Sequence, residues 1–204
     1  MTTSSPGFTR LAVDERRRRL LERGRALFTT HPYDELSMAA IARDAGISKA
    51  LLYHYFPSKQ AYFVATLQEA AQELATRVRP PEDDPPRRQL IFALDGWLDW
   101  VGANRDAYSR LMRSATSVPE LRELVDNVRA ATCRLISDRL LAGSAGSPEV
   151  RAAVNGWLWF MDGVCLDWVE HGDVDREHTH ALLLGALPGI LSASGLPELA
   201  ARLL

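Results

Sequence analysis

The sequence has little of what marks secreted or membrane proteins. Only two of its 204 residues are cysteines, and Cys133 and Cys165 stand singly within apolar helical patterns, so we expect buried free thiols and no disulfide. Residues 1–20 lack the apolar segment of a signal peptide. The longest uncharged apolar runs, such as Ala181–Leu196, fall short of the roughly 20 residues that a bilayer requires. We therefore expect a cytoplasmic protein with no membrane partner.

Motifs of common enzyme classes are also missing. The sequence contains no Gly-x-Ser-x-Gly, no Cys-x-x-Cys and no His-Glu-x-x-His. A metal site is the alternative for one stretch rich in imidazoles and carboxylates, which comprises His171, Asp173, Asp175, Glu177, His178 and His180. However, His178 and His180 are two residues apart and fall on different faces of a helix. We expect no enzyme activity, no metal ion and no cofactor.

Lysine is scarce, and charge is unevenly distributed along the chain. The 24 Lys and Arg face 26 Asp and Glu, a net charge of −2, and only Lys49 and Lys59 are lysines. Residues 1–60 hold ten basic and six acidic side chains, a net of +4, so the rest carries −6. A basic N-terminal part on an acidic body suits nucleic-acid binding at one end. Within it, the block Arg16–Arg19 is typical of a solvated helix face, with phosphate contact by one or two arginines as the alternative.

Residues 37–59 have the pattern of two short helices joined by a tight turn, with a third helix starting directly afterwards. Ser37 and Ser48 are good N-caps, and Gly46 lies where the chain reversal requires a positive φ. Pro57 ends the second helix. The residues expected to face inward are Met38, Ile41, Ala42, Ala45, Ile47, Leu52 and Phe56. This is a helix-turn-helix pattern, in which the second helix enters the major groove of DNA.

The same segment resembles the DNA-binding segment of the TetR (tetracycline-repressor) family. Residues 45–59, Ala-Gly-Ile-Ser-Lys-Ala-Leu-Leu-Tyr-His-Tyr-Phe-Pro-Ser-Lys, are similar to the family's usual Ala-Gly-Val-Ser-x-x-x-Leu-Tyr-x-Tyr/His-Phe-x-Ser-Lys. The likeness covers about Leu20–Leu67 residue by residue, and the remainder only as a pattern of helices. It departs at Pro32, where a glycine usually ends the first helix, so the geometry of the Thr30–Leu36 connection stays open.

The resemblance implies a double-stranded DNA operator as partner. The residues expected to bind it, by matched position, are Ser37, Met38, Ser48, Lys49, Ala50, Leu51, Tyr53, His54 and Lys59. Lys49 and His54 are candidates for phosphate or base-edge bonds, and Tyr53 and Lys59 for phosphate contacts. Ala50 permits close approach, Leu51 is suited to a thymine methyl, and the amides at the start of the first motif helix suit a phosphate.

Helical periodicity continues through the rest of the chain, without any strand pattern or internal repeat. We expect an all-α protein of about nine helices. A helix-turn-helix DNA-binding domain is expected over residues 10–57, and a helical ligand-binding and dimerisation domain over residues 58–204. Besides the two motif helices, the expected helices are Leu11–His31, Ser58–Arg79, Arg87–Ala103, Arg105–Ser114, Pro119–Leu141, Pro148–His171 and one that starts at Asp175.

The body offers aromatic and sulfur-containing side chains suited to lining a pocket for a large apolar ligand. They are Trp97, Trp100, Tyr108, Met112, Trp157, Phe160, Met161 and Cys165. The alternative for each is a place in an ordinary core. Four carboxylates on otherwise apolar helices are candidates for a ligand's polar group, or else surface residues: Asp95, Asp99, Asp162 and Asp167. We expect a hydrophobic small-molecule effector.

The last two long helices have more apolar surface than one domain covers, which favours a twofold homodimer over a large monomer core. The resemblance implies that they form a four-helix bundle between protomers. We therefore expect a ligand-responsive repressor that binds a near-palindromic operator as a dimer and is released by a hydrophobic small molecule. A transcriptional activator of the same fold, and a helical ligand-binding protein that does not touch DNA, are the alternatives.

Overall fold

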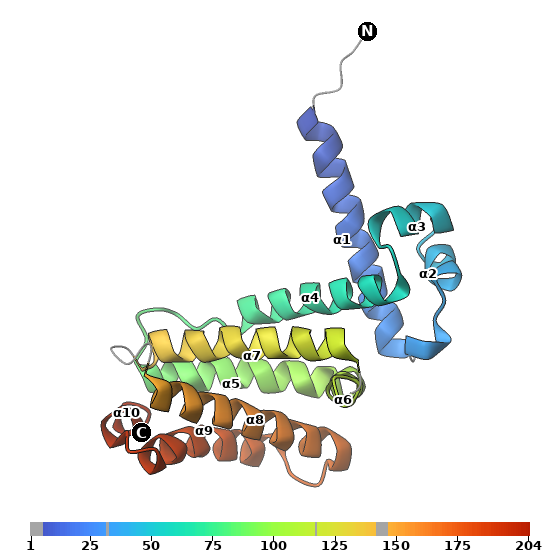
Figure 1. Ribbon diagram of the computed structural model, residues 1–204. Coiled ribbons are helices and arrows are strands. Elements are labelled where there is room, and N and C mark those ends of the chain that lie inside the picture. Colours follow the sequence, from blue (N-terminus) through green and yellow to red (C-terminus); the bar gives the residue numbers. More distant parts are fainter. Residues whose placement is uncertain (1–5, 32, 117, 142–146) are drawn as a thin grey trace. The chain divides into compact units, whose positions relative to one another are not determined.

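The computed structural model of the protein describes residues 6–31, 33–116, 118–141 and 147–204, with side chains from residue 13 onward. Over these ranges the chain is helical and contains no strand (Figure 1). The elements are α1 (Pro6–Thr30), η1 (Tyr33–Glu35), α2 (Met38–Asp44), α3 (Lys49–Tyr55), α4 (Lys59–Arg77), α5 (Pro86–Ala103), α6 (Arg105–Ser114), α7 (Pro119–Arg139), α8 (Pro148–His171), α9 (Arg176–Ala193) and α10 (Pro197–Ala201). The predicted all-α fold is thereby confirmed, while Pro32 lies outside the described residues.

The chain forms two compact units, residues 1–72 and residues 73–204, and the boundary between them falls inside α4. The predicted domains meet earlier, between residues 57 and 58, because that division separates expected roles and assigns all of α4 to the second domain. As a division of roles it stays a prediction.

The first unit packs α1, α2, α3 and the beginning of α4 around one apolar core. Its buried side chains are Leu20, Leu21, Phe28, Leu36, Met38, Ile41, Ala42, Leu52, Phe56, Tyr62 and Ala65. α1 and α4 approach closely at Gly24, where an added Cβ would lie 2.6 Å from both Tyr62 Oη and Thr66 Oγ1. The Tyr62 hydroxyl donates to the carbonyl of Leu20 at 2.6 Å in the same place. Position 24 therefore requires a residue without a side chain.

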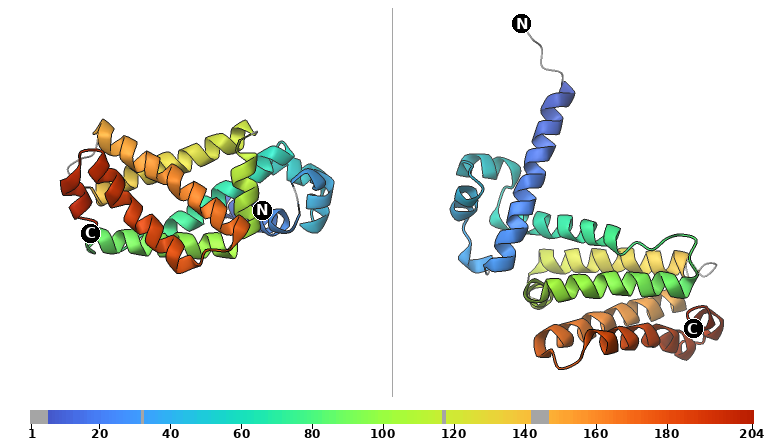
Figure 2. Two further views of the ribbon diagram at one scale, coloured as in Figure 1. Left: turned by 90° about the horizontal axis from the view of Figure 1, so that it is seen from below. Right: turned by 180° about the vertical axis from the view of Figure 1, so that it is seen from behind.

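α8 is the central helix of the second unit, and it packs against α5, α6, α7 and α9 (Figure 2). Ser147 caps it by accepting a hydrogen bond from a first-turn amide, Pro148 fits the first turn, and Gly172 ends it in the left-handed conformation at φ 67°. The indole of Trp157 donates to the carbonyl of Leu183 in α9 at 3.0 Å. This buried hydrogen bond fixes α8 against the last long helix.

The predicted helices are found, with differences at their ends. α6 and α8 occupy the predicted ranges, whereas α1 begins at Pro6 instead of Leu11, because its first residues carry no apolar stripe that periodicity could detect. η1 and α10 lie outside the predicted set, since segments of three and five residues are too short to show a helical period. No helix in the described ranges has both the length and the apolarity to cross a bilayer.

Candidate nucleic-acid interface

The ends of α2 and α3 are fixed by serine caps and one glycine turn. Ser37 Oγ accepts a hydrogen bond from the amide of Ala40, and Ser48 Oγ accepts one from Leu51, both at 3.1 Å. Between the helices Gly46 adopts φ 65°, a conformation that residues with a side chain rarely adopt. These are the predicted caps and the predicted turn, so the helix-turn-helix geometry is confirmed in this unit.

The two sides of α3 have opposite character. Leu52 and Phe56 are 0% and 2% exposed and belong to the core that also buries Ile41. The outer side carries Lys49, Ala50, Tyr53 and His54, all exposed. The Lys49 ammonium lies 5.8 Å from the centroid of the Tyr53 ring, one turn further along. α3 therefore presents a cationic, hydrogen-bonding surface backed by a rigid core.

Three of the predicted DNA-contact residues lie differently from these four. Met38 is 5% exposed, so only its backbone amide remains available, which is the contact predicted for it. Leu51 is half-buried. The Lys59 ammonium donates to the carbonyl of Tyr33 at 3.0 Å and lies 4.1 Å from the centroid of the Tyr33 ring. Lys59 thus anchors η1, and its phosphate contact stays a prediction.

Two arginines of α1 attach that helix to the motif, a role that the sequence pattern does not assign to them. The Arg23 guanidinium donates from Nε and Nη2 to the two carboxylate oxygens of Asp44 at 2.6 and 2.9 Å. These hydrogen bonds hold the pKa of Asp44 below its usual value. The guanidinium of Arg17 lies 5.3 Å from the centroid of the Phe56 ring. Because 21 residues separate Arg23 from Asp44, no local spacing signals the pair.

In the second unit, α5 and α6 bring three predicted ligand-binding aromatics together. The Trp97 and Trp100 rings stack with centroids 5.7 Å apart, and Tyr108 stands edge-on to Trp97 at 5.8 Å. The Trp97 indole donates to the sulfur of Cys165 at 3.4 Å. Burial raises the pKa of the Cys165 thiol to about 12, so the thiol stays protonated at neutral pH. Met112 packs against the core that contains this cluster.

Met161 and Trp157 are buried in the same core, but Phe160 is not part of it. Phe160 is 38% exposed, and its neighbour Trp159 is 58% exposed. Both lie on the outer side of α8. Phe160 is therefore corrected from a pocket residue to a surface residue. The sequence misses this because α8 is apolar nearly all round, so its pattern does not distinguish the inner side from the outer one.

A buried ion pair lies next to the aromatic cluster. Arg129 is 7% exposed and donates from Nη2 and Nε to one oxygen of Asp162 at 2.6 and 3.2 Å. The guanidinium lies 3.8 Å from the centroid of the Trp159 ring. Burial raises the pKa of Asp162 and outweighs the opposite effect of Arg129. The Tyr108 hydroxyl is 3.5 Å from Asp162, and its pKa is raised chiefly by burial.

The other carboxylates considered as ligand partners have partners within the protein. Asp95 and Asp99 each accept from Arg176, at 3.0 and 2.7 Å, and Asp167 lies 3.1 Å from His171. Asp162 is likewise paired, with Arg129, and it also lies 3.5 Å from the Tyr108 hydroxyl of the aromatic cluster. In the part of the chain that the structure describes, no three His, Cys, Asp or Glu side chains gather closely enough to hold a metal ion.

Comparisons with known proteins agree with this arrangement. Residues 20–66 match the bacterial regulatory proteins of the tetR family, and residues 86–187 match the tetracyclin repressor-like C-terminal domain. The HTH-type transcriptional regulator BetI of Stenotrophomonas maltophilia is 30% identical over 190 residues, which cover 84% of this chain and 92% of BetI. The HTH-type transcriptional activator FasR of Mycolicibacterium smegmatis is 33% identical over 101 residues, which cover 48% of this chain and 46% of FasR.

The fold is likewise that of a solved relative. A tetR-family transcriptional regulator from Streptomyces coelicolor superposes with a TM-score of 0.81 at 28% identity, over 93% of this chain and 88% of that one. Its likeness extends across both units. With the helix-turn-helix geometry and a relative matched over most of its length, the family indicated by the motif is confirmed: the chain belongs to the TetR family of transcriptional regulators, which are DNA-binding proteins and not enzymes.

Proposed function

We propose that the protein is a repressor that binds a near-palindromic operator as a dimer. The observation that carries this proposal is the exposed face of α3, with Lys49, Tyr53 and His54 held outward by a core in which Leu52 is fully buried. One such helix makes few base contacts. Two of them, spaced about one helical turn of roughly 34 Å, read a twofold-symmetric site. A regulator of this kind acts on DNA in the cytoplasm.

The outer sides of α8 and α9 support a homodimer through these helices. They expose large apolar side chains, with Trp159 at 58%, Phe160 at 38% and Leu182 at 45%. Between them lie glycines where an added Cβ would meet nothing within 4 Å: Gly156, Gly163, Gly185 and Gly189. Small residues beside large apolar ones allow two helix pairs to pack closely. The same surface on a second copy is its natural complement.

The effector that we propose is a hydrophobic small molecule bound around Trp97, Trp100, Tyr108 and Met112. The polar groups next to this site are the Tyr108 hydroxyl and the ion pair of Asp162 with Arg129. The molecule would release the operator by favouring an arrangement of α4 in which the two recognition helices no longer match successive grooves. It can act only through unequal affinity for the two arrangements, so operator and effector should weaken each other reciprocally.

A transcriptional activator of the same fold is the second candidate. The observation that favours it is the likeness to FasR, whose name describes an activator, although the match covers under half of FasR. A ligand-binding protein without DNA binding fits less well, because the exposed face of α3 retains its basic and hydrogen-bonding side chains.

The proposal is tested by electrophoretic mobility shift with duplex DNA from the region upstream of the protein's own coding sequence. Wild-type protein should shift one segment in preference to random DNA. The variant Tyr53→Ala/His54→Ala should bind that segment at least tenfold more weakly, since removing a base-edge or phosphate contact costs about 1–3 kcal/mol.

The matched control removes an exposed aromatic of α5 and an exposed amide of α7 from the second unit, as Phe92→Ala/Asn127→Ala, and should bind like wild type. Absence of any preferred segment for the wild-type protein would contradict the proposal. So would equal affinity of Tyr53→Ala/His54→Ala and wild type for that segment. Transcription from the bound promoter with and without protein then distinguishes a repressor from an activator.

A further inference from the structure

The N-terminal half of α1 extends beyond the segment that matches the family. The match begins at Leu20, whereas the helix begins at Pro6 and runs past α3 within its unit (Figure 1). From residue 13 to residue 19 all side chains except Glu15 are exposed, and burial starts with Leu20 and Leu21. Residues 6–19 contain five arginines and two acidic residues, a net of +3. Residues 13–19 therefore contribute charge to the unit and little to its core.

The two sides of this helix differ in their electrostatic surroundings. Arg16, Arg19 and Arg23 are spaced by three and four residues, so they line one side of α1. Arg23 is bound to Asp44 at the end of α2, which places this side beside the turn that leads into α3. Arg18 and Arg25 point to the opposite side. There Arg18 has a raised pKa because of its bond to Glu15, with further contributions from Glu22 and Glu69.

We infer that Arg16 and Arg19 bind backbone phosphates of the duplex that flanks the segment read by α3. The inference rests on the proposed DNA binding. At 1.5 Å per residue, Arg19 and Arg16 lie about 6 and 10 Å beyond Arg23 along the helix, a reach of roughly two to three base pairs. Guanidinium groups keep their charge at all working pH values and match phosphate oxygens in pairs.

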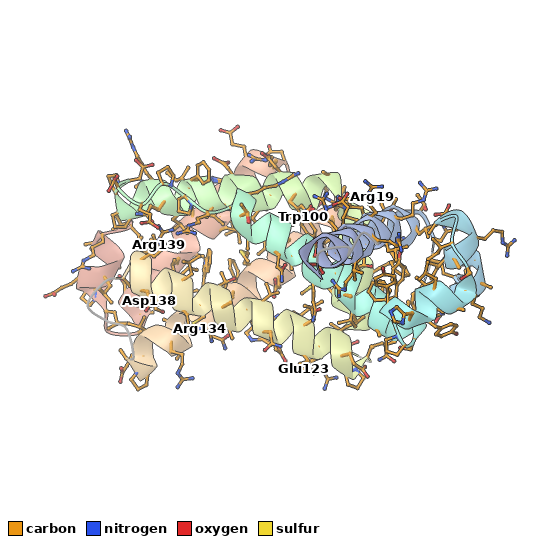
Figure 3. The ribbon with its side chains drawn as sticks, turned by 90° about the horizontal axis from the view of Figure 1, so that it is seen from above. Arg19, Trp100, Glu123, Arg134, Asp138 and Arg139 are labelled. Atoms are coloured by element: carbon orange, nitrogen blue, oxygen red, sulfur yellow. The ribbon has the colours of Figure 1, made fainter. Side chains whose placement is uncertain are left out.

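The existing bond of Arg19 does not prevent this contact. Arg19 donates to Glu15 at 2.8 Å, but its side chain is 73% exposed (Figure 3). Exposed pairs of this kind are worth about 0–1 kcal/mol, so a phosphate can replace the carboxylate. Glu15 also binds Arg18, so this carboxylate does not distinguish the two sides. The difference is that Glu22 and Glu69 act on Arg18 as well, and these further carboxylates disfavour a polyanion on that side.

The test compares two variants of the full-length protein that each lose two positive charges from the same helix. Arg16→Gln/Arg19→Gln removes two charges from the side of α1 beside α2, and Arg18→Gln/Arg25→Gln removes two charges from the opposite side. Binding is measured by fluorescence anisotropy at 50–200 mM salt. The probes are the promoter segment mapped by footprinting, once with about five flanking base pairs at each end and once without them.

On the longer duplex, the slope of log affinity against log salt should fall by about 0.9 for each phosphate that the variant no longer binds, or about 2 per protomer for Arg16→Gln/Arg19→Gln. When salt is raised from 50 to 200 mM, this variant should therefore lose roughly tenfold less affinity per protomer than wild type loses. On the trimmed duplex this variant should match wild type, and Arg18→Gln/Arg25→Gln should match wild type on both duplexes. Circular dichroism checks that α1 stays helical.

Unchanged affinity and slope for Arg16→Gln/Arg19→Gln on the longer duplex would overturn the inference, while the proposed function would stand. Equal losses in the two variants would also overturn it, because they would show general attraction without a preferred side. An equal loss on the trimmed duplex would rule out the flanks as the contact. If wild-type protein binds neither duplex, it is the proposed function that fails.

Discussion

Lys59 shows how a single side chain can have a role that its motif position does not reveal. Its place in the motif predicts a phosphate contact, yet its ammonium donates to the carbonyl of Tyr33 and packs on that residue's ring. The pattern Ser-Lys after a proline carries no information about η1, which lies 26 residues earlier in the chain. An ammonium has three donors, so anchoring η1 and touching a phosphate are compatible.

The two roles of Lys59 predict different results for Lys59→Ala. A phosphate contact predicts weaker binding on all sequences and a salt slope smaller by about 0.9 per protomer. An anchor for η1 predicts a lower melting temperature, because removing a donor from a part-buried carbonyl costs about 1–3 kcal/mol.

We expect both effects for Lys59→Ala, measured by salt-dependent anisotropy and by thermal unfolding without DNA. The control Lys49→Ala should change the DNA binding alone, since Lys49 is exposed and its ammonium lies beside the exposed Tyr53 ring, 5.8 Å from the ring centroid. A stability unchanged in Lys59→Ala would rule out the anchoring role. A slope unchanged would rule out the phosphate contact.

At the scale of whole helices, the sequence predicts most of what the structure contains. Serine caps, prolines in first turns and apolar periodicity are local signals, so α6 and α8 have their predicted bounds. The features that the sequence does not predict are contacts between distant residues, very short helices and segments without an apolar stripe. The start of α1 lacks an apolar stripe, α10 is five residues long, and the pairing of Arg129 with Asp162 spans 33 residues. Likewise, the pattern of α8 cannot exclude Phe160 from the interior.

The ion pair that joins α7 to α8 yields a prediction about stability. In Arg129→Leu, the carboxylate of Asp162 stays buried without its partner, so the free energy of unfolding at pH 7 should fall by about 3 kcal/mol or more. The double variant Arg129→Leu/Asp162→Leu removes both charges and should recover most of that loss. Chemical denaturation measures both. The control Arg134→Leu lies on the exposed side of α7 and should stay near wild type (Figure 3).

The same pair determines a dependence on pH. The folded-state pKa of Asp162 is raised above its unfolded value, which is about 3.9. In the interval between the two values the folded state binds more protons, so stability from this group is greatest at low pH and declines as pH rises through that interval. In Arg129→Leu the pKa of Asp162 should rise further, so the decline due to this group should extend to higher pH, and it should be absent in the double variant. A single variant whose stability does not change with pH would contradict this account.

At the scale of the whole molecule, the proposed dimer should determine how strongly the protein binds DNA. In Gly185→Trp a large side chain is added where the single chain has open space, so the fold should persist while the proposed α8–α9 contact between copies is blocked. Light scattering after size exclusion should change from twice 22.7 kDa to 22.7 kDa. The salt slope of DNA binding should fall by about half, because a single protomer binds only half as many phosphates.

The control for this prediction is Ala130→Trp, which adds the same side chain at an exposed position of α7. It should leave the mass of the assembly unchanged. A dimer that survives Gly185→Trp would place the contact between copies elsewhere on the surface.

The hydrogen bond from the Trp97 indole to the Cys165 sulfur places a reactive group next to the proposed effector site. The Cys165 thiol can therefore report on motions of the second unit. Cys165 is fully buried, and its thiol keeps its proton, so an alkylating or disulfide reagent can reach and react with it only while the surrounding helices are transiently apart. The labelling rate of the Cys165 thiol therefore measures how often these helices separate. Any compound that binds at the proposed effector site around Trp97 should lower this rate, whether or not its chemical identity is known beforehand.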